Sequence, residues 1–107
     1  DKGTRFAAHR IKSLVGFFIL RRAMHDIGHF RDRIDHIDEQ ILSLLNERAR
    51  AAQEIGVIKQ QLGLPVLDSQ REKSILARLT AQNMGPMKSE HISTIFTAII
   101  SGCRELE

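Results

Sequence analysis

Hydrophobic residues recur every three or four positions between residues 34 and 62, and polar residues fill most positions between them. This period is that of an α-helix with one buried face. The stripe continues for about 30 residues, roughly 45 Å of helix, so a small monomer could not cover it alone. The pattern therefore predicts a long helix that packs against a partner helix and ends at Gly63. The stripe comprises Ile34, Ile37, Ile41, Leu44, Leu45, Ala51, Ile55, Ile58 and Leu62.

Two shorter helices are predicted after this break. The segment "DSQREKSIL" starts the first of them, where Ser69 and Glu72 fit an S-x-x-E capping box directly after Asp68. The segment "NMGP" then breaks the chain before the last helix. Glu107 lies four residues after Cys103, which places it on the apolar face of that helix. With no clear strand signal, the pattern predicts an all-α fold, a three-helix protomer with one long first helix.

Residues 1–29 form an N-terminal extension whose structure the pattern leaves open. Its apolar run "LVGFFIL" is far shorter than the ~20 residues that span a bilayer, so we expect no membrane insertion. Arg21 and Arg22 stand where a secretory signal needs small residues. A helix packed on the bundle or its partner, a secretory signal and a loosely ordered segment all remain open. The chain begins with Asp1 and not with Met, so we expect a fragment or a processed product, with Met24 as a candidate start.

The net charge of +3 arises at one end of the chain. Residues 1–23 hold six of the 16 Lys and Arg residues and one of the 13 Asp and Glu residues. The other residues hold ten basic and twelve acidic groups, and are therefore net negative. Trp and Tyr, which stack on bases, are absent from the chain. We therefore expect no nucleic-acid partner, although the first segment alone could form a basic module that binds a polyanion.

The cysteine and the histidines of the sequence do not indicate a metal site or a catalytic nucleophile. Cys103 is the one cysteine, which excludes an internal disulfide and suits a reducing, cytoplasmic setting. Its place on an apolar stripe favours a packing role over a nucleophile. His25, His29, Asp32 and His36 fall along one helical stripe. Without a second coordinating segment they make a poor metal site, so we expect no metal.

Two cations interrupt the long apolar stripe. Arg48 occupies a stripe position, and Lys59 follows eleven residues later, within about 20° of the same direction. Two inward cations repel each other unless an anion lies between them, such as Asp68, Glu72 or an anionic ligand. The alternative is an arginine that reaches solvent at the edge of the bundle or pairs with an acid of the partner helix. Arg31 points about 100° away from Arg48, so in a symmetric dimer it could serve the neighbour's site.

The stretch from Phe30 to Glu107 resembles an all-helical, AroQ-type chorismate mutase domain. The motifs R-x-x-I-D-x-I-D, L-L-N-E-R, I-G-x-I-K, P-V-x-D-x-x-R-E and C-R-x-L-E arrive in this order. The resemblance implies a chorismate mutase domain over 30–107 and an intertwined homodimer with two equivalent sites. The reaction would convert chorismate to prephenate by an intramolecular Claisen rearrangement, in the biosynthesis of phenylalanine and tyrosine. The resemblance implies no cofactor, metal or covalent intermediate.

The resemblance also implies roles for three cations. Arg48, and Arg31 of the other subunit, would bind substrate carboxylates, which suits the forked guanidinium group. Lys59 would bridge a carboxylate and the ether oxygen of the breaking bond.

Five further residues match the motif. Glu72 would bind the ring hydroxyl with help from Asp68, and Arg71 would order this cluster. Glu107 would meet the ether oxygen opposite Lys59, where some relatives carry glutamine. A glutamate donates only in its protonated form, so we expect activity to fall as pH rises. Cys103 replaces a serine that contacts a carboxylate in some relatives, and its thiol donates only weakly.

A second hypothesis is a catalytically silent, dimeric helical module that regulates a larger aromatic-pathway enzyme. A purely structural dimer could fill the stripe with leucine and gain stability, because a buried ion pair contributes little. The retained cations and Glu72 therefore argue for catalysis.

Overall fold

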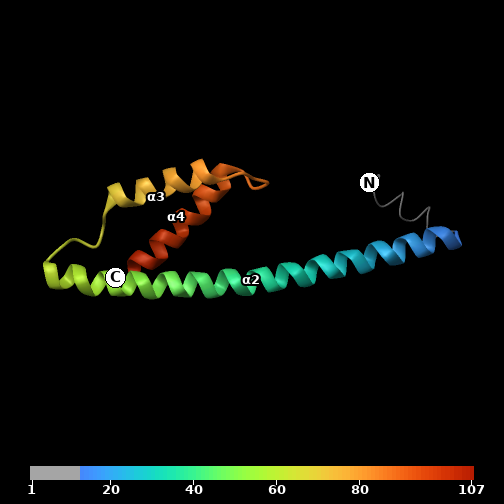
Figure 1. Cartoon of the computed structure of the whole chain (residues 1–107), viewed down its shortest axis with the longest axis horizontal. Helices are drawn as coiled ribbons and strands as arrows, with labels where there is room; N and C mark the ends of the chain where they lie inside the picture. Colours follow the sequence, from blue (N-terminus) through green and yellow to red (C-terminus); the bar gives the residue numbers. More distant parts are fainter. Residues whose placement is uncertain (1–12) are drawn as a thin grey trace. The chain divides into compact units, whose positions relative to one another are not determined.

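The computed structural model describes residues 13–107, and these form three helices and no strand. They are α2 (Leu14–Leu62), α3 (Ser69–Gln82) and α4 (Ser89–Glu105), as Figure 1 shows. The chain divides into two compact units, one up to Ile41 and one over Leu42–Glu107. The predicted all-α, three-helix architecture with a long first helix is confirmed.

The first helix begins at Leu14, well before the apolar stripe that predicted it. The Ser13 hydroxyl accepts a hydrogen bond from the Gly16 backbone N–H at 2.8 Å, which caps the new start. The run "LVGFFIL" is therefore helical and forms the start of α2. Its packing on the bundle or on a partner stays a prediction. Within residues 13–107 no helix is long and apolar enough to cross a membrane. The expectations about residues 1–12 lie outside the described residues.

The start of α3 corrects one prediction. Asp68, and not Ser69, is the N-cap residue, because its carboxylate accepts the Arg71 backbone N–H at 2.9 Å. The negative charge of Asp68 suits the positive end of the helix dipole better than a hydroxyl does. With the cap one position earlier, Glu72 lies beyond the third helical position that a capping box requires. Its carboxylate is left to bond elsewhere.

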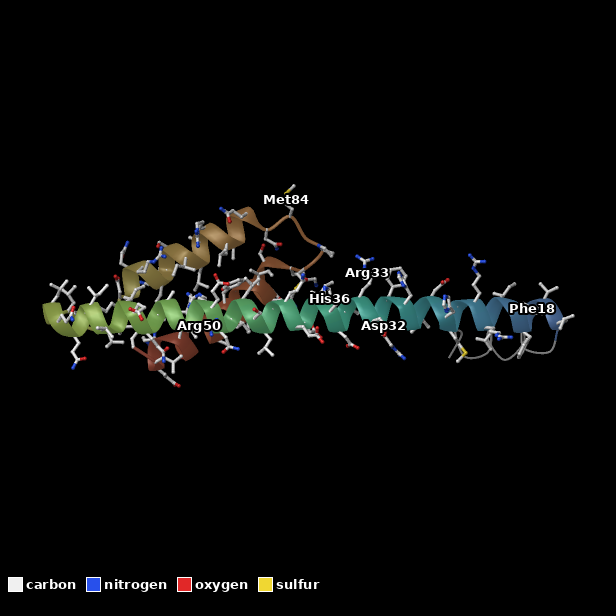
Figure 2. The ribbon with its side chains drawn as sticks, turned by 60° about the horizontal axis from the view of Figure 1, so that its bottom comes forward. Phe18, Asp32, Arg33, His36, Arg50 and Met84 are labelled. Carbon is white, nitrogen blue, oxygen red and sulfur yellow. The ribbon has the colours of Figure 1, made fainter. Side chains whose placement is uncertain are left out.

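The second unit holds the buried apolar side chains of the described chain. Ala52 of α2 is buried there together with Ile75 of α3 and with Ile100 and Cys103 of α4. The helices α3 and α4 pack on each other and are joined by a loop. At the tip of this loop Met84 points away from the ribbon (Figure 2).

The apolar stripe of α2 is largely uncovered in the single chain. Ile34 is 54% exposed, Ile41 49% and Leu44 62%. Exposed apolar rows of this length are unusual for a monomer and mark an interaction surface. The stripe is therefore consistent with the predicted partner helix.

Candidate active site

A cavity of about 480 Å³ lies in the unit over Leu42–Glu107. This volume falls in the usual range for small-molecule sites. Its apolar walls come from α2, the following loop and α4. Seven of the eight residues predicted for the site line it, namely Arg48, Lys59, Asp68, Arg71, Glu72, Cys103 and Glu107.

Arg31 is the exception. It is not among the residues that line the cavity, and its side chain is exposed in the unit that ends at Ile41. Its contribution to a neighbour's site stays a prediction.

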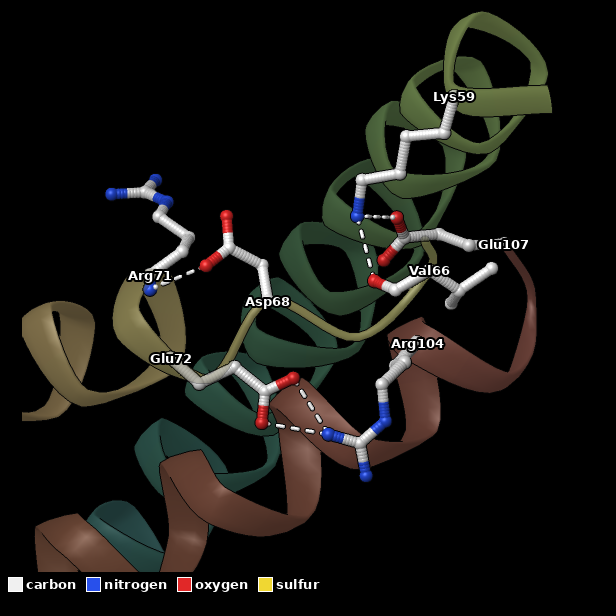
Figure 3. A network of polar contacts seen from close by, with 7 residues as sticks. All are labelled: Lys59, Val66, Asp68, Arg71, Glu72, Arg104 and Glu107. Atoms are coloured by element: carbon white, nitrogen blue, oxygen red, sulfur yellow. Dashed lines mark hydrogen bonds and ion pairs between the residues drawn. The ribbon is translucent and has the colours of Figure 1, made fainter. Parts of the chain in front are cut away.

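Lys59 is held at the cavity wall by two acceptors. Its Nζ donates to the Val66 carbonyl oxygen at 2.7 Å and to Glu107 Oε1 at 2.8 Å (Figure 3). The side chains of Lys59 and Glu107 are only 18% and 13% exposed. An ammonium group has three N–H donors, so one remains for a ligand. The two internal hydrogen bonds thus orient the ammonium group and leave one of its donors available.

Glu107 reaches Lys59 because α2 has no side chain at Gly56. A Cβ at this position would lie 2.7 Å from both the Cα and the carbonyl oxygen of Glu107, closer than real contacts allow. The helix α4 ends at Glu105, and the Glu107 N–H then donates to the Arg104 carbonyl at 3.1 Å. This final turn directs the last carboxylate toward α2. Close packing at Gly56 thus positions an ionisable group of the cavity.

A second ion pair joins α3 to α4. Arg104 Nη1 donates to both Glu72 oxygens, at 2.7 Å and 2.6 Å (Figure 3). Arg104 also lines the cavity, and the sequence reasoning did not name it. The signal was present in the final C-R-x-L-E motif. Arg104 follows the buried Ile100 by four residues, which places the two side chains on the same face of α4.

The charge of the cavity is unevenly paired. Four cations, Arg48, Lys59, Arg71 and Arg104, meet three carboxylates, Asp68, Glu72 and Glu107. Within residues 13–107 the salt bridges of the cavity engage Lys59 and Arg104 only. Two guanidinium groups are therefore available to an anion, and each can bind a carboxylate through two parallel hydrogen bonds. The arrangement suits a small, negatively charged ligand.

The histidine stripe, His25, His29 and His36 with Asp32, lies on one helix, α2. Across the part of the chain that the structure describes, no group of three or more His, Cys, Asp and Glu side chains could hold a metal ion.

Comparison with known families decides the classification. Residues 30–107 match the family model described as chorismate mutase type II. The chain belongs to this family. The resemblance drawn from the sequence motifs is thereby confirmed.

Members of the chorismate mutase type II family with known names or structures agree with this assignment. A chorismate mutase from Thermus thermophilus (form II) superposes with a TM-score of 0.74 at 42% identity, covering 76% of this chain and 92% of that one. A bifunctional chorismate mutase/prephenate dehydratase of Aquifex aeolicus is 40% identical over 88 residues, 78% of this chain. A chorismate mutase of Methanocaldococcus jannaschii is 43% identical over 53 residues, 50% of this chain and 54% of that protein. This chain spans about a quarter (24%) of the length of the Aquifex relative.

Proposed function

We propose that this chain converts chorismate to prephenate by an intramolecular Claisen rearrangement, and so serves phenylalanine and tyrosine biosynthesis. The observation that carries the proposal is a cavity in which free guanidinium groups lie beside a Lys59–Glu107 pair. Chorismate is a small dicarboxylate, which such a cavity would bind. The reaction needs no cofactor, because the substrate has only to be held in a folded, chair-like conformer while charge develops on its ether oxygen.

Arg48 and Lys59 would each bind a different negatively charged part of chorismate. Arg48 has no ion-pair partner among residues 13–107, so its fork is free to bind a carboxylate. Lys59 keeps one N–H beyond those given to Val66 and Glu107. That donor would face the ether oxygen, where a preorganised positive charge lowers the barrier most.

Glu107 would complete the site from the opposite side of the ether oxygen. In the structure it accepts a hydrogen bond from Lys59, whereas donation to an oxygen requires a proton on the carboxyl group. The proposed activity should therefore depend on pH.

The remaining predicted residues would recognise the ring and fix the loop before α3. Glu72 would accept the ring hydroxyl. Asp68 is ordered by the Arg71 N–H, so Arg71 helps to build this wall through its backbone. Cys103 would make a minor contact with a carboxylate, because a thiol is a weak donor.

We also propose that the chain works as an intertwined homodimer in which each subunit donates Arg31 to its neighbour's site. The exposed apolar stripe of α2 supports the dimer, since a second copy could cover it. Arg31 is exposed within the first unit, which leaves its guanidinium group available to a second subunit. A reducing, cytoplasmic location suits the single free cysteine.

The test follows the loss of chorismate absorbance with the purified chain, with Lys59→Ala and Arg48→Ala, and with Arg50→Ala as the control. Arg50 lies on the same helix (Figure 2) and is exposed. It is not among the residues that line the cavity. We expect Lys59→Ala to lower kcat roughly 10²–10³-fold, the effect of removing one preorganised donor. Arg48→Ala should lower kcat/KM roughly 10–100-fold or more, as for a lost hydrogen bond to a charged group.

A parent chain without activity would overturn the proposal and favour the silent regulatory module. An active parent with unchanged Lys59→Ala and Arg48→Ala rates would instead refute the site assignment.

A further inference from the structure

We infer that Arg104 is a positioning residue that sets the specificity of the site for a substrate hydroxyl. It acts through Glu72 and does not touch the substrate. The inference rests on the proposed function and adds a residue to it.

The contact between Arg104 and Glu72 is close and partly shielded from water. One nitrogen, Nη1, lies 2.7 Å from Oε1 and 2.6 Å from Oε2. The two side chains are 33% and 25% exposed, so bulk water screens the pair only in part. The cation comes from the last turn of α4 and the carboxylate from the first turn of α3. The pair therefore fixes the direction of Glu72 from outside its own helix.

This geometry determines what Glu72 can bind. A carboxylate offers only acceptors, and both oxygens of Glu72 already accept from the Arg104 guanidinium group. Because a single nitrogen meets both oxygens, each oxygen keeps a further lone pair for another donor. A hydroxyl group satisfies that need, whereas a second carboxylate would be repelled. Glu72 therefore favours a hydroxyl donor, whereas the free guanidinium groups favour carboxylates.

The alternative is that Arg104 itself binds a substrate carboxylate. Its Nη1 is already occupied by Glu72, whereas Arg48 and Arg71 have no ion-pair partner among residues 13–107. An incoming carboxylate would have to break the Glu72 contact to gain what the other two arginines already provide. The free arginines are the better carboxylate ligands, and Arg104 remains with Glu72.

The experiment is a double-mutant cycle with two substrates. The variants are Arg104→Met, Glu72→Gln and the double variant, assayed with chorismate and with its analogue that lacks the ring hydroxyl. Methionine keeps the length and helix propensity of the arginine stem without its charge. Arg78→Met, at an exposed site on α3 away from the cavity, is the matched control and should match the parent.

We expect Arg104→Met to lower kcat/KM for chorismate roughly 10–100-fold, as for a lost hydrogen bond to a charged group. For the analogue, kcat/KM should change little. The ratio of kcat/KM for chorismate to that for the analogue should therefore fall by the same factor. The double variant should have the same kcat/KM for chorismate as Glu72→Gln alone, because the effects of two residues that act through one contact are not additive. Arg104→Lys should restore part of the preference.

Two results would overturn the inference while leaving the mutase proposal intact. One is an equal loss of activity on both substrates, and the other is additivity of the two single variants. Either would make Arg104 a direct substrate ligand or a structural residue. If Arg104→Met does not fold, as judged by circular dichroism, Arg104→Gln replaces it in the same cycle. A parent chain that is inactive on chorismate would refute the proposed function itself.

Discussion

The two units of the chain share one long helix but differ in what their side chains do. In residues 42–107 three helices meet, bury apolar side chains and pair charges that are far apart in sequence. In residues 13–41 a single helix carries exposed side chains such as Phe18 and Asp32 (Figure 2). The polar contact found there is local, between the His36 imidazole and the Glu39 carboxylate at 3.9 Å. Helical periodicity is present in both units, but a binding cavity requires several elements to converge.

The largest expected effect is the loss of the dimer. Ile41→Asp places a charge on the apolar stripe of α2, where a second copy would have to desolvate it at a cost of several kcal/mol. We expect monomers in sedimentation experiments and loss of most activity. Ser43→Asp adds the same charge on another side of the exposed helix and should leave the dimer intact. A dimeric, active Ile41→Asp protein would show that the stripe is not the interface.

The second prediction tests whether the two units cooperate across subunits. Arg31→Ala and Lys59→Ala proteins should each be nearly inactive as homodimers. When unfolded and refolded together in equal amounts, they should recover about a quarter of the parental activity, because half of the dimers are mixed and each mixed dimer has one intact site. Tagged subunits would verify the mixing. No recovery in proven heterodimers would place Arg31 in its own subunit's site or in none.

A pair of glycine variants compares the two units directly. Gly56→Ala should cost roughly 1–3 kcal/mol of unfolding free energy, as overpacking does, and displace Glu107 from Lys59. At Gly28 an added Cβ would have no atom within 4 Å, so Gly28→Ala should stabilise the helix by up to about 1 kcal/mol. Thermal unfolding and kcat measure both. Equal effects at the two positions would contradict the close approach at Gly56.

The smallest expected effect is on the pH profile. Because only a protonated carboxyl group can donate to the ether oxygen, the proposed role of Glu107 predicts that kcat/KM of the parent declines as pH rises. Glu107→Gln carries a permanent donor and should flatten this limb. Profiles of both proteins, measured with the same buffers and ionic strength, are the test. A parent profile that is flat where Glu107→Gln is not would exclude this role for Glu107.

Much of the fold could be predicted from local patterns. The apolar period located the long helix, and the glycine and proline breaks separated α2, α3 and α4. Predictions that depended on the exact cap were less successful: Asp68 caps α3 in place of Ser69, because the choice depends on which side chain reaches the Arg71 N–H. The start at Leu14 was left open, since a short apolar run suits several structures.

The candidate site was partly visible in the sequence. Helical geometry placed Arg48 and Lys59 in nearly one direction, and both line the cavity. The pair of Arg104 and Glu72 was not predicted, because the two residues lie 32 positions apart on different helices and no local spacing relates them.

The sequence by itself determined the helices, the inward cations and the family, because each is encoded in spacing along the chain. The tertiary structure decided which charges meet. Lys59 pairs with Glu107 across 48 positions, through the space left at Gly56. Glu72 pairs with Arg104, and Asp68 provides the N-cap of α3 in place of a capping box. Such contacts depend on how separate helices approach one another, and periodicity within a helix carries no information about that approach.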